Sequence, residues 1–409
     1  MRIVQKFGGT SVGSLERIRH TAGLVQAELE RGNQVAVVVS AMSGETNRLT
    51  ALAHELCARP AARELDALVA TGEQVSAALL AIELQQRGIA AYSHSGGQAG
   101  FVTDSRHVRA RIKNVDGSHL LAHLEAGEVP VVTGFQGVDE RGNITTLGRG
   151  GSDTSAVALA IAVEADMCDI YTDVDGIYTT DPRIVPRARK IERIAYEEML
   201  EFASLGAKVL QTRSVELAMR YNMPLHLRSS FEPVAGTMVV QEDDVQEDDS
   251  MERATISGVA YNRDEAKITI MGIPDQPGIA AKVFGPVAEA GINVDVIVQN
   301  VSEQGYTDIT FTVPTGDYRQ TMEIMRRLCE QMHGRNVKGD DSIAKVSVIG
   351  VGMRSHAGVA KDMFDILAQE GVNIQMITTS EIKITVVIEE KYVELAVRTL
   401  HSAFGLDSE

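Results

Sequence analysis

Tryptophan is absent from this sequence of 409 residues and aromatic residues make up only 4% of it, a scarcity that by itself excludes no class of function. Cysteine is rare as well. Cys57, Cys168 and Cys329 lie far apart, and no two of them stand at the spacing of zinc ligands. Neither a disulfide framework nor a zinc site is therefore predicted. We expect each thiol to be a small buried hydrophobe, and we predict no residues dedicated to a metal ion.

Long hydrophobic runs and an excess of basic residues are also missing. No stretch approaches the roughly 20 apolar residues of a membrane-spanning helix, and the segment Arg2–Phe7 predicts a strand instead of a signal peptide. Lys+Arg 39 against Asp+Glu 56 gives a formal net charge of −17, which repels a phosphate backbone. We therefore expect a cytoplasmic protein that has neither nucleic acid nor a membrane as partner.

What is present is a globular composition, with 44% hydrophobic and 23% charged residues, over a length that predicts several domains. From Met1 to about Val240, short β-branched runs alternate with helical patterns, which is typical of an α/β fold with a mostly parallel sheet and helices on both faces. Val35–Ser40 is the clearest buried strand, and Ser14 precedes a helix that Gly32 ends. Further strands are expected at Val129–Thr133, Asp169–Thr172 and Pro224–Arg228, and further helices at Asp66–Arg87, Ser155–Ala165 and Tyr196–Tyr221, the last one broken near Gly206.

The chain changes in character at residue 241. Residues 241–253 contain an acidic run that self-repulsion keeps solvated, so we predict a linker there. After it the sequence repeats itself, because Ala266–Ile273 is echoed by Ala344–Val351. Each repeat is expected to fold in the β-α-β-β-α order of a ferredoxin-like α+β domain. The predicted domains are 1–240, 264–342 and 343–409, with 254–263 available as an extra strand of the last one.

Four segments at strand ends of the first domain are candidates for chemistry. They are Lys6–Ser14, Ser40–Asn47, Thr145–Ser155 and Tyr171–Tyr178. Glycines let backbone N–H groups close on an anion at a helix N-terminus, and Lys6 and Arg149 add positive charge. Neither a Walker loop nor the dinucleotide fingerprint occurs in the chain, and the last segment lacks the spacing of an EF-hand calcium loop. The segment Thr71–Gln74 interrupts a helical stretch, so Glu73 can face a cleft.

These motifs together resemble the aspartokinase family. Lys6-Phe7-Gly8-Gly9-Thr10-Ser11, Gly148-Arg149-Gly150-Gly151-Ser152-Asp153, Tyr171-Thr172-Asp173-Val174-Asp175-Gly176 and the doubled C-terminal module carry the resemblance, which covers essentially the whole chain. It implies an amino-acid-kinase fold followed by two ACT domains. It also implies the reaction ATP + L-aspartate → ADP + 4-phospho-L-aspartate, which opens the biosynthesis of lysine, threonine, methionine and diaminopimelate.

The resemblance also implies roles for single residues. The ATP-binding positions would be Lys6, Phe7, Gly8, Gly9, Thr172, Asp173, Tyr178, Arg183 and Lys208. The aspartate-binding positions would be Ser40, Ala41, Thr46, Glu73, Arg149 and Ser152. Lys6, Asp153 and Lys208 would be catalytic, with Asp153 organising the lysines, and Mg²⁺ would be held mainly by the phosphates of ATP and water.

Regulation by end products is implied by the two ACT domains. The effectors would be threonine and lysine, and the effector positions would be Asp275, Gly278, Ile279, Ala280, Asn293, Gln299, Asn300, Asn373 and Ile374. The second repeat lacks an acidic residue at the place of Asp275, so we expect the first repeat to be the main threonine receptor. Met251 resembles an internal start, which predicts either a homo-oligomer or an assembly of long and short subunits.

Two alternatives remain at this stage. A kinase of the same fold that acts on N-acetylglutamate, glutamate or UMP would share the first domain, but the doubled ACT region argues against it. An amino-acid sensor without catalysis would not need Lys6, Arg149, Asp153 and Lys208 together. No further domain follows the repeats, so fusion to a homoserine dehydrogenase is not expected.

Overall fold

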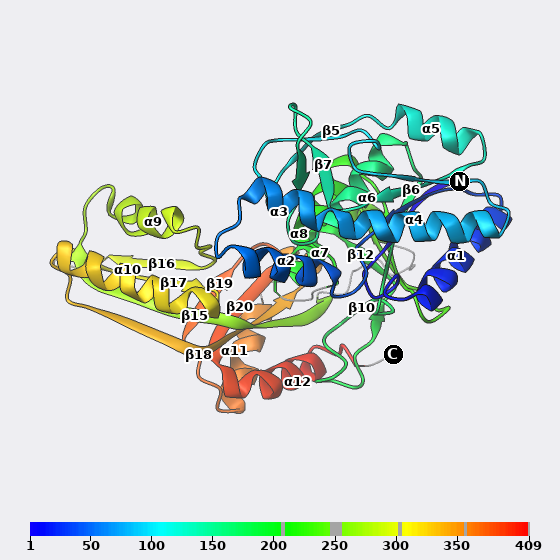
Figure 1. The fold of residues 1–409 in the computed structure, drawn as a ribbon. Coiled ribbons are helices and arrows are strands. Elements are labelled where there is room, and N and C mark those ends of the chain that lie inside the picture. The colour runs from blue at the N-terminus through cyan, green and yellow to red at the C-terminus, as the bar shows by residue number, and fades with distance from the viewer. Residues whose placement is uncertain (206–208, 246–255, 302–304, 356–357, 408–409) are drawn as a thin grey trace. The chain divides into compact units, whose positions relative to one another are not determined.

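The computed structural model describes residues 1–205, 209–245, 256–301, 305–355 and 358–407, which form two compact units (Figure 1). Unit 1 comprises Met1–Ile177 and Lys190–Asp249, and unit 2 comprises Tyr178–Arg189 and Ser250–Glu409. The contacts of the segment Tyr178–Arg189 therefore assign it to unit 2, although the residues before and after it in the sequence belong to unit 1.

Unit 1 is a three-layer α/β structure. Its helices are α1 (Leu15–Glu30), α2 (Glu45–Leu56), α3 (Ala62–Val69), α4 (Thr71–Gln86), α5 (Ser118–Glu125), α6 (Gly151–Ala162), α7 (Tyr196–Ser204), α8 (Thr212–Tyr221) and the short η1 (Glu242–Val245). Its strands are β1 (Arg2–Phe7), β2 (Gln34–Val39), β3 (Ala91–His94), β4 (Phe101–Thr103), β5 (Ile112–Val115), β6 (Val129–Thr133), β7 (Gln136–Val138), β8 (Ile144–Thr146), β9 (Met167–Thr172), β12 (Arg193–Ala195), β13 (Leu225–Ser229) and β14 (Thr237–Val240). Two short strands, β10 (Ile177–Tyr178) and β11 (Lys190–Ile191), stand where the chain passes between the units.

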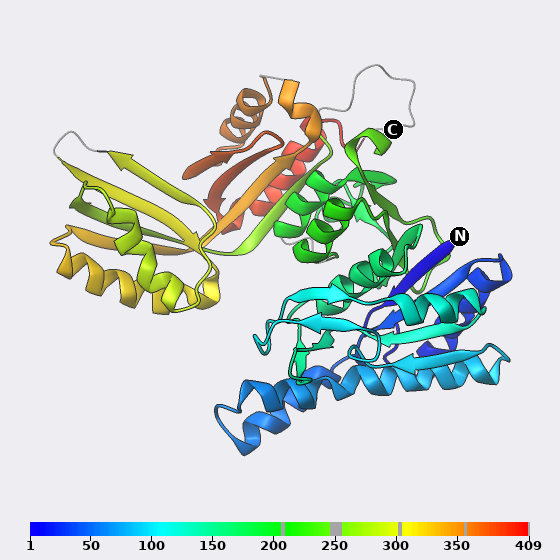
Figure 2. The same ribbon diagram turned by 90° about the horizontal axis from the view of Figure 1, so that it is seen from above.

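The main sheet of unit 1 has eight strands in the order β12-β14-β13-β9-β1-β2-β6-β3, and a small sheet has the order β5-β4-β7-β8. Strand β1 lies between β2 and β9 and is parallel to both. Helices α1 and α4 cover one face of this sheet and α6 covers the other (Figure 2). Apolar side chains of α1 and α4 form a core with β1, β2 and β6. Because β1, β2, β6 and β9 are parallel, their carboxyl ends meet at one edge, where open α/β sheets bind ligands.

Local sequence signals account for most of these elements. The hydroxyl of Ser14 caps α1 by accepting a hydrogen bond from Arg17 N over 3.2 Å, as the N-cap pattern predicts. The helical stretch expected at Asp66–Arg87 begins earlier, at Ala62, and it is divided at Ala70 into α3, which ends at Val69, and α4, which begins at Thr71. The expected start of a helix at Ser155 is also late, since α6 begins at Gly151. Cys57 is exposed, contrary to expectation, whereas Cys168 and Cys329 are buried.

One helical stretch, Ala62–Gln86, is long and apolar enough to cross a membrane by length and composition alone. The sequence prediction that no stretch approaches a membrane-spanning helix did not anticipate it. Its apolar residues Ala77, Leu80 and Leu84 are buried in the core beside β2 and β6. These contacts are those of a core helix, and half of the apolar window is buried inside the protein.

Unit 2 is an α+β structure built on one antiparallel sheet. Its helices are α9 (Ile279–Glu289), α10 (Tyr318–Gln331), α11 (Val359–Gln369), α12 (Val393–Ala403) and the short η2 (Thr315–Asp317), η3 (Val351–Ser355) and η4 (Glu390–Tyr392). Its strands are β15 (Gly258–Pro274), β16 (Ile297–Val301), β17 (Tyr306–Val313), β18 (Asn336–Ile349), β19 (Met376–Thr379) and β20 (Lys383–Glu389). The sheet order is β16-β17-β15-β18-β20-β19.

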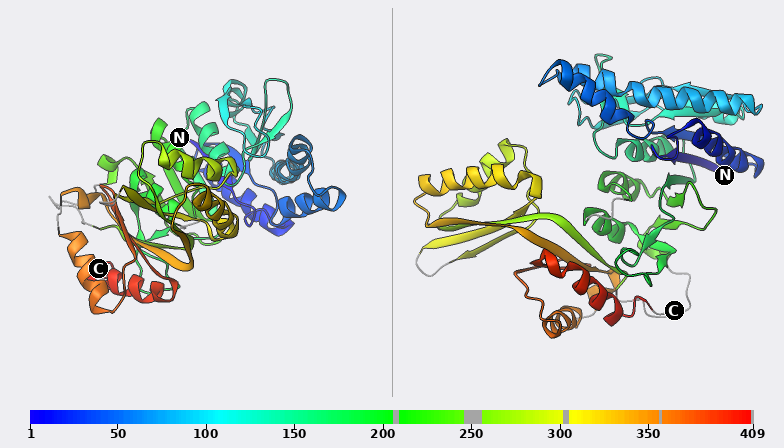
Figure 3. Two further views of the ribbon diagram at one scale, coloured as in Figure 1. Left: turned by 90° about the vertical axis from the view of Figure 1, so that its left-hand side faces the viewer. Right: turned by 60° about the horizontal axis from the view of Figure 1, so that its bottom comes forward.

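Two long strands join the repeats of unit 2 into this single sheet. The second half of β15 pairs with β17 in the first repeat, and residues 258–262 pair with residues 345–349 of β18 in the second repeat. Helices α9 and α10 cover one face over the first repeat, and α11 and α12 cover the opposite face over the second (Figure 3). Ile184 and Val185 belong to the core of the second repeat, which explains why the segment Tyr178–Arg189 joins unit 2.

Candidate active site

A cavity of about 230 Å³ lies at the carboxyl edge of the unit 1 sheet. It is lined by Lys6, Ser40, Ala41, Thr46, Glu73, Phe135, Gly148, Arg149, Gly150, Gly151, Ser152 and Asp153. These residues come from the ends of β1, β2 and β6 and from the first turns of α2, α4 and α6. All six predicted aspartate positions are among them, together with Lys6 and Asp153.

Lys6 and Asp153 form a largely buried ion pair in the wall of this cavity. Lys6 Nζ lies 2.6 Å from Asp153 Oδ1, and each side chain is only 10% exposed. Lys6 is near the end of β1, and Asp153 sits in the first turn of α6, where the positive end of the helix dipole favours a carboxylate. The carboxylate thus holds the ammonium group in place, and the remaining hydrogens of that group can meet an anion in the cavity.

Close backbone packing brings Glu73 to the cavity. A Cβ atom on Gly72 would lie 2.9 Å from Ala41 Cβ, so only glycine lets the start of α4 approach the loop that follows β2. As a result Glu73 Oε1 accepts a hydrogen bond from Ala41 N over 3.1 Å. The sequence predicted that Glu73 can face a cleft, and the structure places it in the cavity wall.

The second carboxylate oxygen of Glu73 is the most unusual atom of the site. Glu73 is only 3% exposed, and its Oε2 has no hydrogen-bond partner among the described residues. Burial raises the pKa of this carboxyl to about 7, against the lowering effect of the N–H groups that it accepts from. A buried, unpartnered carboxylate oxygen is costly unless a cation arrives to pair with it.

Arg149 offers the opposite charge in the same cavity. It is exposed, and no other described residue pairs with its guanidinium group. The turn that presents it needs glycine, because Gly148 and Gly150 have φ of +79° and +70°. A Cβ on Gly150 would also lie 1.9 Å from Gln211 Cγ. A free guanidinium fork at a helix N-terminus suits a carboxylate or a phosphate.

The predicted phosphate-binding loop lies beside the end of β9. Gly8 N donates a hydrogen bond to Tyr171 O over 3.3 Å, and a Cβ on Gly9 would lie 2.9 Å from Ala41 O. Thr172 and Asp173 follow Tyr171 directly, and the Thr172 hydroxyl donates to Asp173 over 3.2 Å. The Phe7 side chain is fully buried and stacks on Tyr171 with ring centroids 4.7 Å apart, so this residue can reach a ligand only through its backbone.

Two of the predicted ATP positions lie in the segment that belongs to unit 2. Tyr178 and Arg183 belong to unit 2, where Asp181 accepts hydrogen bonds from the Arg183 guanidinium over 2.7 Å and from the Tyr261 hydroxyl over 2.9 Å. The Arg183 side chain is 88% exposed. Lys208 lies outside the described residues.

The predicted effector positions lie in both repeats of unit 2. Asp275 and Gly278 belong to the turn before α9, with Gly278 in the left-handed region at φ +87° as the N-cap. Gln299 and Asn300 are exposed on the edge strand β16, and Asn293 is exposed before it. Ile279 is buried while Ala280 is exposed, and in the second repeat Asn373 is exposed and Ile374 is half-buried.

Phe135 is a cavity residue that the sequence analysis did not name. It follows β6 and Gly134, has a φ of +68°, and its backbone N–H donates to Ser155 over 3.0 Å. The available signal was its position, directly after the valine-rich strand at Val129–Thr133. Asp66 was also missed as a structural carboxylate, since it is fully buried and accepts from Thr146 over 2.5 Å and from His107 over 2.8 Å.

Known proteins share this architecture along the whole chain. Residues 1–229 match the model of the Amino acid kinase family, and residues 267–330 and 346–404 each match an ACT domain. The fold and the site therefore define an ATP-dependent kinase of the amino-acid kinase class with two regulatory ACT domains. The kinase class and the α/β fold followed by two α+β domains confirm the sequence predictions.

Relatives narrow this class to one family. An aspartokinase of Pseudomonas aeruginosa is 58% identical over 99% of this chain and 98% of its own. The structure of Escherichia coli aspartokinase III with aspartate and ADP (R-state) has a TM-score of 0.81 at 29% identity, over 98% of this chain and 99% of that one. The lysine- and aspartate-bound T-state of the same enzyme has a TM-score of 0.77 at 30% identity, over 98% and 99%. The chain belongs to the aspartokinase family, which opens the biosynthesis of lysine, threonine and methionine.

Proposed function

We propose that the cavity of unit 1 binds L-aspartate and presents its β-carboxylate to the γ-phosphate of ATP. The observation that carries this proposal is the presence of opposite charges in one small cavity, where a Glu73 oxygen and the Arg149 guanidinium have no partner among the described residues. An α-amino acid needs one anionic and one cationic partner for its ammonium and α-carboxylate. ADP release that depends on aspartate, with the acyl phosphate trapped by hydroxylamine, tests the reaction.

Each cavity residue then has a chemical role. The Glu73 carboxylate pairs with the substrate ammonium, and Arg149 holds the α-carboxylate through two parallel hydrogen bonds. The hydroxyls of Ser40, Thr46 and Ser152 and the backbone of Ala41 line the remaining space. The β-carboxylate, with a reference pKa of about 3.9, is ionised at neutral pH and needs no general base.

The transfer itself joins two anions. A β-carboxylate oxygen forms a bond to the γ-phosphorus, the bond to the bridging oxygen breaks, and that electron pair leaves on ADP. Lys6, fixed by Asp153, and the backbone N–H groups near Gly8 and Gly9 compensate the charge that builds up. We assign Lys208 to the same task from the other side of the phosphates, and Thr172, Asp173, Tyr178 and Arg183 to the nucleotide.

A kinase that uses ATP needs a divalent metal ion, and we propose Mg²⁺. The acidic side chains of the cavity have other partners in this proposal, because Asp153 pairs with Lys6 and Glu73 is assigned to the substrate ammonium. The cavity therefore offers few protein ligands for the ion, which fits an ion held by the phosphates of ATP and by water. Asp153 is the carboxylate beside the Lys6 ammonium. When bound, the ion adds positive charge to the transferring phosphoryl group.

Aspartate affinity is expected to depend on pH through Glu73. Because the pKa of the free carboxyl is raised to about 7, most of it is protonated at pH 6 and most is ionised at pH 8. A bound ammonium favours the ionised form, so the KM for aspartate should rise about tenfold from pH 8 to pH 6 while the KM for ATP changes little. Initial rates at saturating ATP measure it.

Glu73→Gln supplies the control for this pH effect. The amide oxygen can still accept from Ala41, but it carries no charge, so the KM for aspartate should be high and nearly constant between pH 6 and pH 8. Glu64→Gln, on the exposed side of α3, should keep the wild-type profile. A pH dependence that persists in Glu73→Gln would assign the titration to another group.

The ACT domains make this an allosteric enzyme, and we propose that threonine acts together with lysine, with the turn before α9 as the threonine site. Asp275 is exposed beside the N-terminus of α9 and can pair with the ammonium group of an amino acid, while the N–H groups of the first helical turn can bind its carboxylate. Gln299, Asn300 and Asn293 can contact the threonine side chain. In the second repeat Gly358 caps α11 with φ −88° instead of a left-handed φ, so the two turns differ in form.

Asp275→Ala should raise the threonine concentration for half inhibition by at least about tenfold, the value of one lost charge-assisted hydrogen bond. Threonine and lysine, singly and together, are titrated against wild type and variant. Glu289→Ala, at the other end of α9, is the matched control. Unchanged inhibition in Asp275→Ala would move the site elsewhere, and no inhibition of wild type by either amino acid would contradict the proposed effectors.

Assembly and location complete the proposal. We propose a homo-oligomer or an assembly with a short chain that starts near Met251, and we propose the cytoplasm as the location. Met251 lies outside the described residues, so its use as an internal start stays a prediction.

A further inference from the structure

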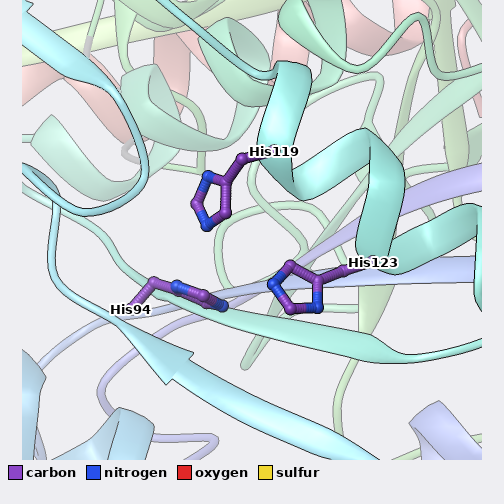
Figure 4. A group of neighbouring side chains, drawn as sticks. All are labelled: His94, His119 and His123. Atoms are coloured by element: carbon purple, nitrogen blue, oxygen red, sulfur yellow. The ribbon is translucent and has the colours of Figure 1, made fainter.

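Three histidines from two elements of unit 1 lie close together, and none of them lines the aspartate cavity. His94 is the last residue of the edge strand β3, and His119 and His123 lie one turn apart on α5 (Figure 4). One ring nitrogen from each lies within 4.8 Å of the other two. The ring centroids are 5.1 to 5.4 Å apart. The spacing of four residues places the two helical rings on one face of α5.

The surroundings of these rings include two features of a metal site, a free ring nitrogen and an outer carboxylate. His94 Nε2 is buried and has no hydrogen-bond partner among the described residues. His123 Nδ1 lies 2.5 Å from Glu128 Oε2, which fixes the tautomer and leaves Nε2 to face its neighbours.

We propose that His94, His119 and His123 bind a divalent transition ion of the Zn²⁺ class. Neutral imidazole nitrogens are preferred ligands of Zn²⁺, Cu²⁺ and Ni²⁺ and poor ligands of Mg²⁺. Three protein nitrogens leave the fourth tetrahedral position to water, and His119 is exposed, so the ion can enter from solvent. Glu128 is the outer carboxylate that orients a ligating histidine.

Only small movements are needed to close the site. Zn–N bonds of about 2.0 to 2.1 Å at tetrahedral angles place the nitrogens about 3.3 Å apart. Side-chain rotations of His119, which is on the surface, and of its neighbours bring them from 4.8 Å to that spacing. The bound ion fastens α5 to β3, and both of these elements flank β6. Simple motif spacing did not reveal the site, because its ligands come from a strand and from a separate helix.

Zinc binding to the full chain tests the proposal directly. Dialysed protein without nucleotide is titrated with ZnCl₂ against a chromogenic chelator, and X-ray absorption identifies the ligands. We expect one equivalent bound at micromolar affinity or tighter with imidazole nitrogens around the ion, together with a rise in melting temperature. His119→Ala should weaken binding by 100-fold or more, and Glu128→Gln by about 10- to 100-fold.

Matched variants separate this site from adventitious ones. His54→Ala removes an exposed histidine of α2, and Cys57→Ser removes the exposed thiol, so neither should change the affinity. Because His119 is on the surface, its variant should keep the circular dichroism spectrum and the turnover of the wild type. One equivalent of zinc held equally well by His119→Ala, or no binding by wild type, would overturn the proposal.

Discussion

Lys6→Ala is expected to lower kcat for aspartate phosphorylation by about 100- to 1000-fold, the range measured when a preorganised electrostatic group is removed from a transition state. The Lys6 ammonium is held 2.6 Å from Asp153 and faces the cavity, so no reorganisation is needed when charge builds up on the transferring phosphoryl group. The KM for aspartate should change much less than kcat. Hydroxylamine trapping of the acyl phosphate measures the loss.

The same substitution leaves Asp153 as an unpaired carboxylate that is 7% exposed, so loss of stability has to be separated from loss of catalysis. Lys6→Met with Asp153→Asn removes both charges and keeps the side-chain volume. This double variant should melt closer to wild type than Lys6→Ala does and should remain as inactive. Near-normal turnover in a folded Lys6→Ala protein would show that the lysine does not act on the phosphate.

Arg149→Lys is expected to raise the KM for aspartate by about 10-fold or more, because an ammonium cannot replace the two parallel hydrogen bonds of a guanidinium group. The charge is kept, so the change isolates the geometry of the contact. The KM for ATP should stay within about twofold of wild type. Initial-rate kinetics with each substrate varied in turn provides both constants.

Arg59→Lys is the matched control for this experiment, since Arg59 is exposed and is not among the cavity residues. It should leave both constants unchanged. Equal losses for aspartate and ATP in Arg149→Lys would indicate a general distortion of the turn at Gly148–Gly151 and would remove the evidence for an α-carboxylate contact.

Part of the candidate site could be predicted from the sequence, because its residues lie at the ends of predicted strands. Lys6 and Ser40 end neighbouring parallel strands, and Asp153 starts the helix after a glycine turn, so all three were expected at one edge of the sheet. The burial of Glu73 was not readable. It depends on the close contact of Gly72 with Ala41, which joins two segments that are distant in sequence.

Other features could not be predicted from the sequence because they depend on tertiary packing. The sequence prediction placed Ile184 and Val185 in the first domain, yet their side chains belong to the core of the second repeat. The repeats were predicted as two domains. That strand β15 takes part in both of them follows only from its pairing with β18. The histidine cluster joins β3 to α5, so the four-residue spacing of His119 and His123 on the helix could not by itself reveal the third histidine, His94, on the strand.

A crystal structure of the protein with L-aspartate and ADP tests the central claim most directly. The account predicts the α-ammonium within hydrogen-bonding distance of Glu73 Oε2, the α-carboxylate on the Arg149 guanidinium, and the β-carboxylate directed toward Lys6. Aspartate bound outside the cavity, or bound in it with the β-carboxylate on Arg149, would contradict the assignment of the site.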